Sequence, residues 1–189
     1  MKKTGSTVRI AYLGVLTALA FIMGYLESLI PSFTGIPGVK AGFANIITMI
    51  SLFSADSFLA GRSDNEHFSS HKPGEESIPS SFSLTCTAAI SVVRILLGGI
   101  TYNGMSAILY GLAGAFFSIA VMYLLAKLRI FSLTAISVAG AVSHNLGQTL
   151  LAVLMLGNAV VYYLPMLIIA GLISGIIIGI IAGLLIHRI

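Results

Sequence analysis

The chain has 189 residues and a net charge of +4; 57% of its residues are hydrophobic and only 8% are Asp, Glu, Lys or Arg. Soluble domains carry about a quarter charged residues, so this composition excludes a soluble enzyme, a disordered chain and a nucleic-acid-binding domain. At roughly 20 residues per span, the length allows about six membrane-spanning helices and little else.

Six long apolar segments follow one another along the chain, and each is predicted to be a transmembrane helix in an all-α bundle. The segments are apolar on every side and about twice as long as the roughly ten-residue alternating strands of membrane barrels, which favours helices. The polar, Ser-rich segment 62–81 is predicted to be a mobile loop. The predicted spans are residues 8–30, 41–60, 84–100, 105–126, 131–156 and 164–187.

Basic residues between the spans predict the orientation. Six spans place both termini on one side, and that side holds eight Lys and Arg residues, against Lys40 alone on the other. Because Lys and Arg concentrate in cytoplasmic loops, both termini and the loop 62–81 are predicted to be cytoplasmic. The eight residues are Lys2, Lys3, Arg9, Arg62, Lys72, Lys127, Arg129 and Arg188.

Small residues recur at four-residue spacing on three predicted spans. This spacing makes a flat stripe along a helix and allows a second backbone to approach closely. Packing within the bundle is the commoner use of such a stripe, and docking of a partner protein is the alternative. The longest, called the glycine stripe below, is Gly171, Gly175, Gly179 and Gly183; the shorter ones are Gly14 with Ala18 and Gly111 with Ala115.

Arg94 lies inside the third predicted span, about 9–12 Å from its outer end at 1.5 Å per residue. A charge at that depth costs at least about 2.5 kcal/mol unless it is paired or faces water. One interpretation is a structural ion pair with Glu27, near the outer end of the first span. The other is an outward-facing pocket in which the guanidinium binds a carboxylate or phosphate. The two interpretations are compatible.

A polar cluster in the fifth span extends this candidate site. His144 and Gln148 share a helix face and Asn145 is adjacent, and polar groups in mid-membrane need partners. Hydrogen bonding between helices would explain them, but their density favours a pocket or pore. Lys40 and Arg94 would attract an anionic group, the amides would orient a polar solute, and Glu27 would position Arg94. The predicted binding residues are Glu27, Lys40, Asn45, Arg94, His144, Asn145 and Gln148.

Several motifs are absent from the sequence. It contains no GxxxxGK[ST] phosphate loop, no Asp-rich DDxxD run, no nucleophile elbow and no HExxH zinc motif. A single cysteine, Cys86, excludes a disulfide framework. The sequence therefore predicts no cofactor, no metal, no catalytic residue and no ATPase activity of its own.

Five strings resemble the bacterial "Gx transporter" family, whose members often carry the name "heptaprenyl diphosphate synthase component I". The family is similar to the S components of energy-coupling factor (ECF) transporters. The resemblance implies a six-helix bacterial inner-membrane protein that captures a small solute from outside and relies on a membrane scaffold and ATPase subunits for energy. The strings are YLESLIP (25–31), IPGVKAGFANIIT (36–48), VRILLGG (93–99), SVAGAVSHNLGQ (137–148) and YYLP (162–165).

The family name implies an alternative function, a membrane subunit of isoprenoid diphosphate metabolism. The absence of an Asp-rich motif speaks against a catalytic role in that chemistry. A membrane scaffold without a ligand is a third possibility.

Overall fold

The computed structural model describes residues 3–29, 45–60 and 79–186. Within these ranges it is built of helices and has no strand, which confirms the all-α class for the described part of the chain. A π-helical turn, η1 (Gly99–Asn103), extends α3, and a 3₁₀ turn, η2 (Asn158–Tyr163), precedes α6. The six long helices are α1 (Lys3–Ser28), α2 (Asn45–Ala60), α3 (Ser81–Gly98), α4 (Met105–Leu128), α5 (Leu133–Leu156) and α6 (Leu164–Ile186).

Five of the six helices are long and apolar enough to cross a membrane. The exception is α2, whose 16 residues reach about 24 Å at 1.5 Å per residue, less than the roughly 30 Å of a bilayer core. Five of the six predicted spans therefore correspond to helices that meet this length and composition, and α2 as described does not. The start of the predicted second span, 41–44, and loop residues 62–78 lie outside the described residues.

Local side chains and backbone geometry set the ends of the helices. The Ser80 hydroxyl accepts hydrogen bonds from the backbone N–H groups of residues 82 and 83, so α3 begins at Ser81, three residues before the predicted span. Ser132 caps α5 in the same way. Gly104 lies between η1 and α4, and Gly157 lies between α5 and η2, with φ of +82° and +85°, a region that favours glycine.

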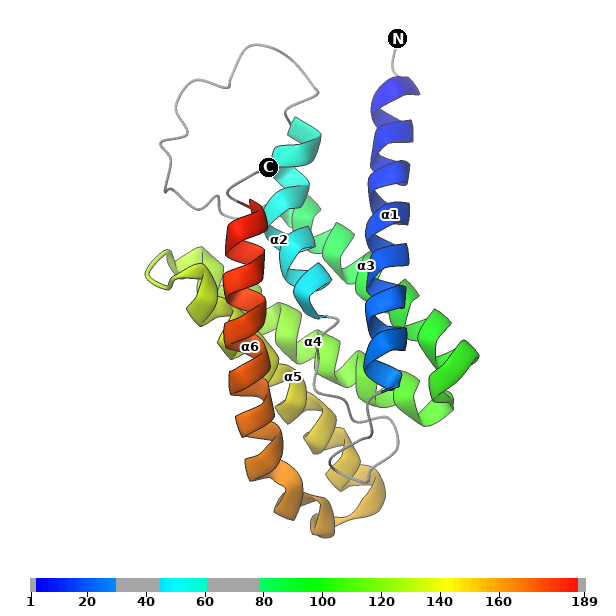
Figure 1. Ribbon diagram of the computed structural model, residues 1–189, viewed down its shortest axis with the longest axis vertical. Helices are drawn as coiled ribbons and strands as arrows, with labels where there is room; N and C mark the ends of the chain where they lie inside the picture. Colours follow the sequence, from blue (N-terminus) through cyan, green and yellow to red (C-terminus); the bar gives the residue numbers. More distant parts are fainter. Residues whose placement is uncertain (1–2, 30–44, 61–78, 187–189) are drawn as a thin grey trace.

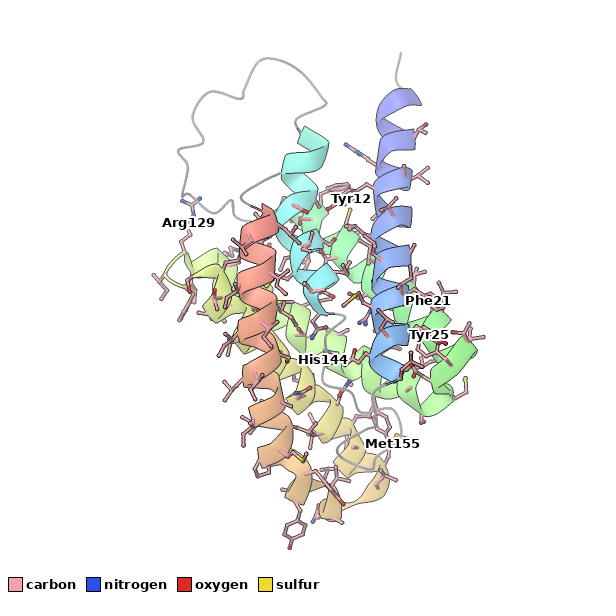
Figure 2. The ribbon with its side chains drawn as sticks, viewed as in Figure 1. Tyr12, Phe21, Tyr25, Arg129, His144 and Met155 are labelled. Carbon is pink, nitrogen blue, oxygen red and sulfur yellow. The ribbon has the colours of Figure 1, made fainter. Side chains whose placement is uncertain are left out.

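The helices form a bundle in which α5 packs along α4 on one side and along α6 on the other (Figure 1). On the opposite side α1 packs against α3, and α2 contacts α1, α3 and α6. The start of α1 and the end of α6 lie toward the same end of the molecule, at the top of the view (Figure 1). The turn between α4 and α5, marked by Arg129, lies toward that end as well (Figure 2).

The glycine stripe of α6 faces α5. A Cβ atom at Gly175 would lie 2.6 Å from the Cα of Val138, and one at Gly179 would lie 2.7 Å from the Cα of Thr134. At Gly183 the nearest atom would be 3.7 Å away, an ordinary contact. The middle of the stripe therefore packs backbone against backbone inside the bundle, which requires residues without a side chain.

The shorter stripes differ from one another. On α4, Gly111 faces α3, since a Cβ there would lie 3.0 Å from Cγ2 of Ile95, and Ala115 is buried. On α1, Gly14 and Ala18 are exposed and line an open groove beside α3. Nothing lies within 4 Å of the Cβ position of Gly14. Partner docking at the α1 stripe therefore stays a prediction.

Buried hydroxyl groups join α2 to α3. Oγ1 of Thr87 donates a hydrogen bond to Oγ of Ser51 (3.1 Å), and Oγ of Ser83 donates to the backbone oxygen of Ser51 (3.2 Å). Nearer the other end of α3, the hydroxyls of Thr48 and Ser91 are 3.4 Å apart. Hydrogen bonds between hydroxyl groups of this kind hold transmembrane helices together. These hydroxyl contacts between α2 and α3 end at Thr48 and Ser91, one helical turn from a polar cavity.

Candidate functional site

A polar cavity of about 50 Å³ lies where α1, α2, α3, η1, α4 and α5 meet. Its walls combine small residues, which let the helices approach, with polar side chains that point inward. Figure 2 shows His144 on α5 within the bundle, where its side chain is buried. The described lining residues are Gly24, Glu27, Asn45, Arg94, Ile95, Gly98, Gly99, Tyr102, Asn103, Ala107, Gly111, His144 and Gln148.

Five of the seven binding residues predicted from the sequence line this one cavity. They are Glu27 from the end of α1, Asn45 from the start of α2, Arg94 from α3, and His144 and Gln148 from α5. These positions are spread over more than 100 residues of sequence, so only the helix packing brings them together.

Two predicted residues are not part of the described lining. Asn145 points from α5 toward α6, where its Nδ2 donates a hydrogen bond to the backbone oxygen of Leu167 at 2.7 Å. It follows His144 directly, and one step along a helix turns the side chain by about 100°. Asn145 therefore ties two helices together while His144 faces the cavity. Lys40 lies outside the described residues.

The cavity lining carries buried polar atoms without a hydrogen-bond partner. Within the described residues six buried side-chain nitrogen or oxygen atoms are unpartnered, and four of the six belong to this lining. Each such atom costs about 1–3 kcal/mol in the absence of a partner, and the great majority of buried polar groups do find one. The four are Asn45 Nδ2, Arg94 Nε, His144 Nδ1 and Gln148 Oε1.

His144 and Gln148 hold each other in a fixed orientation. Nε2 of Gln148 lies 2.9 Å from Nε2 of His144. An amide nitrogen only donates, so the ring nitrogen accepts, and the proton of a neutral imidazole then sits on Nδ1. The ring rests on Gly114 of α4, where a Cβ would come within 2.7 Å of Cε1. Glycine at 114 is therefore required for this position of the imidazole.

Glu27 and Arg94 bring opposite charges to the same cavity, close enough to attract each other. Glu27 is buried, with 8% of its surface exposed. Arg94 is partly exposed, although its Nε is buried. The pairing and the ligand interpretations of Arg94 are both compatible with this placement, because a guanidinium has five N–H donors and one carboxylate does not use them all.

Tyr102 forms a wall of the cavity but is not among the binding residues predicted from the sequence. Its hydroxyl donates to the backbone oxygen of Phe21 (3.3 Å), and its ring packs against Phe21 and Tyr25, with centroids 5.5 and 5.4 Å apart. Cβ atoms at Gly24 and Gly98 would lie 2.8 and 2.9 Å from this hydroxyl. The sequence signal was a pair of glycines inside apolar spans, but nothing in it connects either glycine to Tyr102.

The lining offers hydrogen bonds and a balanced pair of charges. Among the residues that the structure describes, no group of three or more His, Cys, Asp or Glu side chains is placed to hold a metal ion.

Membrane-length apolar helices around an internal polar cavity define a multi-pass helical membrane protein. The chain belongs to the heptaprenyl diphosphate synthase component I family, whose model matches residues 16–60 and 78–185. This confirms the family predicted from the five strings, and the matched residues include the whole described lining of the cavity. No curated protein and no solved structure matches the chain.

Proposed function

We propose that this protein is the solute-binding component of a membrane transport system. The observation that carries the proposal is the set of four unpartnered polar atoms, contributed by α2, α3 and α5, around one cavity. A ligand with matching polar atoms would complete hydrogen bonds that the helices themselves do not supply. The protein captures the solute and passes it across the membrane with partner subunits, in the manner of ECF S components with their scaffold and ATPases.

The position of the cavity supports capture from outside. Glu27 is next to the last residue of α1 and Asn45 is the first residue of α2, and both of these helix ends are predicted to face the outside. We therefore propose a bacterial inner-membrane protein with cytoplasmic termini and an outward-facing site.

The orientation can be tested with single cysteines in a Cys86→Ser background. Asn158 begins η2 and is exposed, and Ile130 in the turn between α4 and α5 is 75% exposed. We expect Asn158→Cys to react with a membrane-impermeant thiol reagent on intact cells, and Ile130→Cys to react only after permeabilisation. The reverse pattern would contradict the proposed orientation.

The family name favours a second candidate, a membrane subunit associated with heptaprenyl diphosphate synthesis. The charges of the lining argue for the first. The described lining holds one carboxylate and one guanidinium, and a diphosphate would add uncompensated negative charge to a site whose two charges already balance.

Native mass spectrometry of the full-length protein, purified from its own cells, tests the proposed function. We expect a co-purified small solute with the wild-type protein and at least about a tenfold loss of it with Arg94→Gln, equivalent to 1.4 kcal/mol of binding free energy. Arg129→Gln, the same substitution at an exposed turn, is the matched control and should retain the solute. Absence of any solute, together with a co-purified prenyl synthase subunit, would support the second candidate instead.

A further inference from the structure

The charges of the cavity limit the class of ligand, an inference that rests on the proposed function. Among the described lining residues, with histidine counted as neutral, only Glu27 and Arg94 carry a full charge, and the two charges cancel. A simple anion or cation would leave the occupied site with a net charge inside a low-dielectric bundle, where uncompensated charge is costly. A neutral or zwitterionic ligand avoids that cost.

The unpartnered atoms define the hydrogen bonds that a ligand must supply. Nδ2 of Asn45, Nε of Arg94 and Nδ1 of His144 are donors, and Oε1 of Gln148 is an acceptor. A carbonyl oxygen with an N–H group beside it matches this combination of donors and acceptors.

The cavity is small, about 50 Å³, which suits a compact polar group such as a primary amide or a urea. A larger solute would place such a group in the cavity and leave the rest of its atoms outside.

We propose that the cavity binds an amide or urea group of a neutral or zwitterionic solute. The carbonyl oxygen accepts from Arg94 and Asn45, and the N–H group donates to Gln148. The sequence predicted an anionic group as the ligand, because Arg94 and Lys40 are both basic, and gave Glu27 only the role of positioning Arg94. Glu27 beside Arg94 in the cavity changes that expectation, since it already supplies the negative charge that Arg94 needs.

Two pairs of nearly isosteric probes test the proposal. Acetamide and acetate have the same number of non-hydrogen atoms and differ in charge and in the N–H donor, and urea and guanidinium differ in charge. Binding of each probe to the full-length protein in nanodiscs is measured by saturation-transfer NMR. We expect acetamide and urea to bind at least about tenfold more tightly than acetate and guanidinium respectively, equivalent to 1.4 kcal/mol.

Charge-changing variants should switch the preference. Glu27→Gln leaves the described lining with a net positive charge, so acetate should then bind more tightly than acetamide. Arg94→Gln leaves it net negative, so guanidinium should bind more tightly than urea. Gln148→Leu removes the acceptor and should weaken acetamide binding, whereas Arg129→Gln should leave every preference unchanged. The wild-type comparison decides the proposal even if a variant does not fold.

The outcomes separate this proposal from the proposed function. Tighter binding of acetate than acetamide by the wild-type protein, or a co-purified native solute without an amide or urea group, overturns the ligand class and leaves the solute-binding role standing. If none of the four probes binds and no solute co-purifies, both proposals are wrong.

Discussion

Gly175→Ala should destabilise the protein by about 1–3 kcal/mol, the usual range for overpacking a close-packed interface. The added Cβ would lie 2.6 Å from the Cα of Val138, and a backbone atom cannot move aside as the end of a flexible side chain can. The helices α5 and α6 would have to separate along their contact. Gly175→Leu should destabilise the protein more, because a larger group would have to enter the same space.

The matched control is Gly183→Ala, the same substitution two turns further along α6. There the nearest atom to the new Cβ is 3.7 Å away, and alanine favours the helix by up to about 1 kcal/mol over glycine. Thermal unfolding in detergent, followed by circular dichroism, should therefore show a clearly lower unfolding temperature for Gly175→Ala than for Gly183→Ala. Leu172→Ala, at a more exposed position of α6, should also have little effect. Equal tolerance at Gly175 and Gly183 would mean that the glycine stripe is not a close packing surface.

Removing one charge from the cavity should produce the other large effect. Arg94→Gln strands the buried Glu27 carboxylate and Glu27→Gln strands the guanidinium, and leaving one charge of a buried pair uncompensated costs about 3–5 kcal/mol. Because Arg94 is partly exposed, we expect about 3 kcal/mol, the low end of that range. The double variant should regain most of the lost stability, since no unpaired charge then remains.

Binding distinguishes a ligand role of Arg94 from a purely structural one. We expect the double variant to be stable but to bind acetamide at least about tenfold more weakly than the wild-type protein, because the Nε donor is gone. Arg94→Lys should also bind poorly, since an ammonium does not reproduce the guanidinium geometry. Arg129→Gln controls for loss of an arginine at the surface and should change stability by no more than about 0.5 kcal/mol. A double variant that recovers both stability and full acetamide binding would leave Arg94 with a structural role alone.

Much of the candidate site was predictable because a polar side chain inside an apolar span costs free energy to bury, so such residues are rare and easily recognised in the sequence. Arg94, His144 and Gln148 stand out in the sequence for this reason, and the structure places them around one cavity. Asn145 stands out equally, yet it bonds to the backbone of α6. The free-energy cost of burying a polar side chain shows that it needs a hydrogen-bond partner. It does not show whether that partner belongs to a neighbouring helix or to a ligand.

The sequence by itself determined the class of this protein, because hydrophobicity along a helix is a local property that depends only on which residues are consecutive. It also determined the family, which the match across 16–60 and 78–185 confirms. Only the tertiary structure decided that the glycine stripe faces α5, that Tyr102 lies against Gly24 and Gly98, and that Glu27 and Arg94 line the same cavity as His144 and Gln148. These features depend on the rotation and spacing of helices distant in sequence, which the packing of the whole bundle sets.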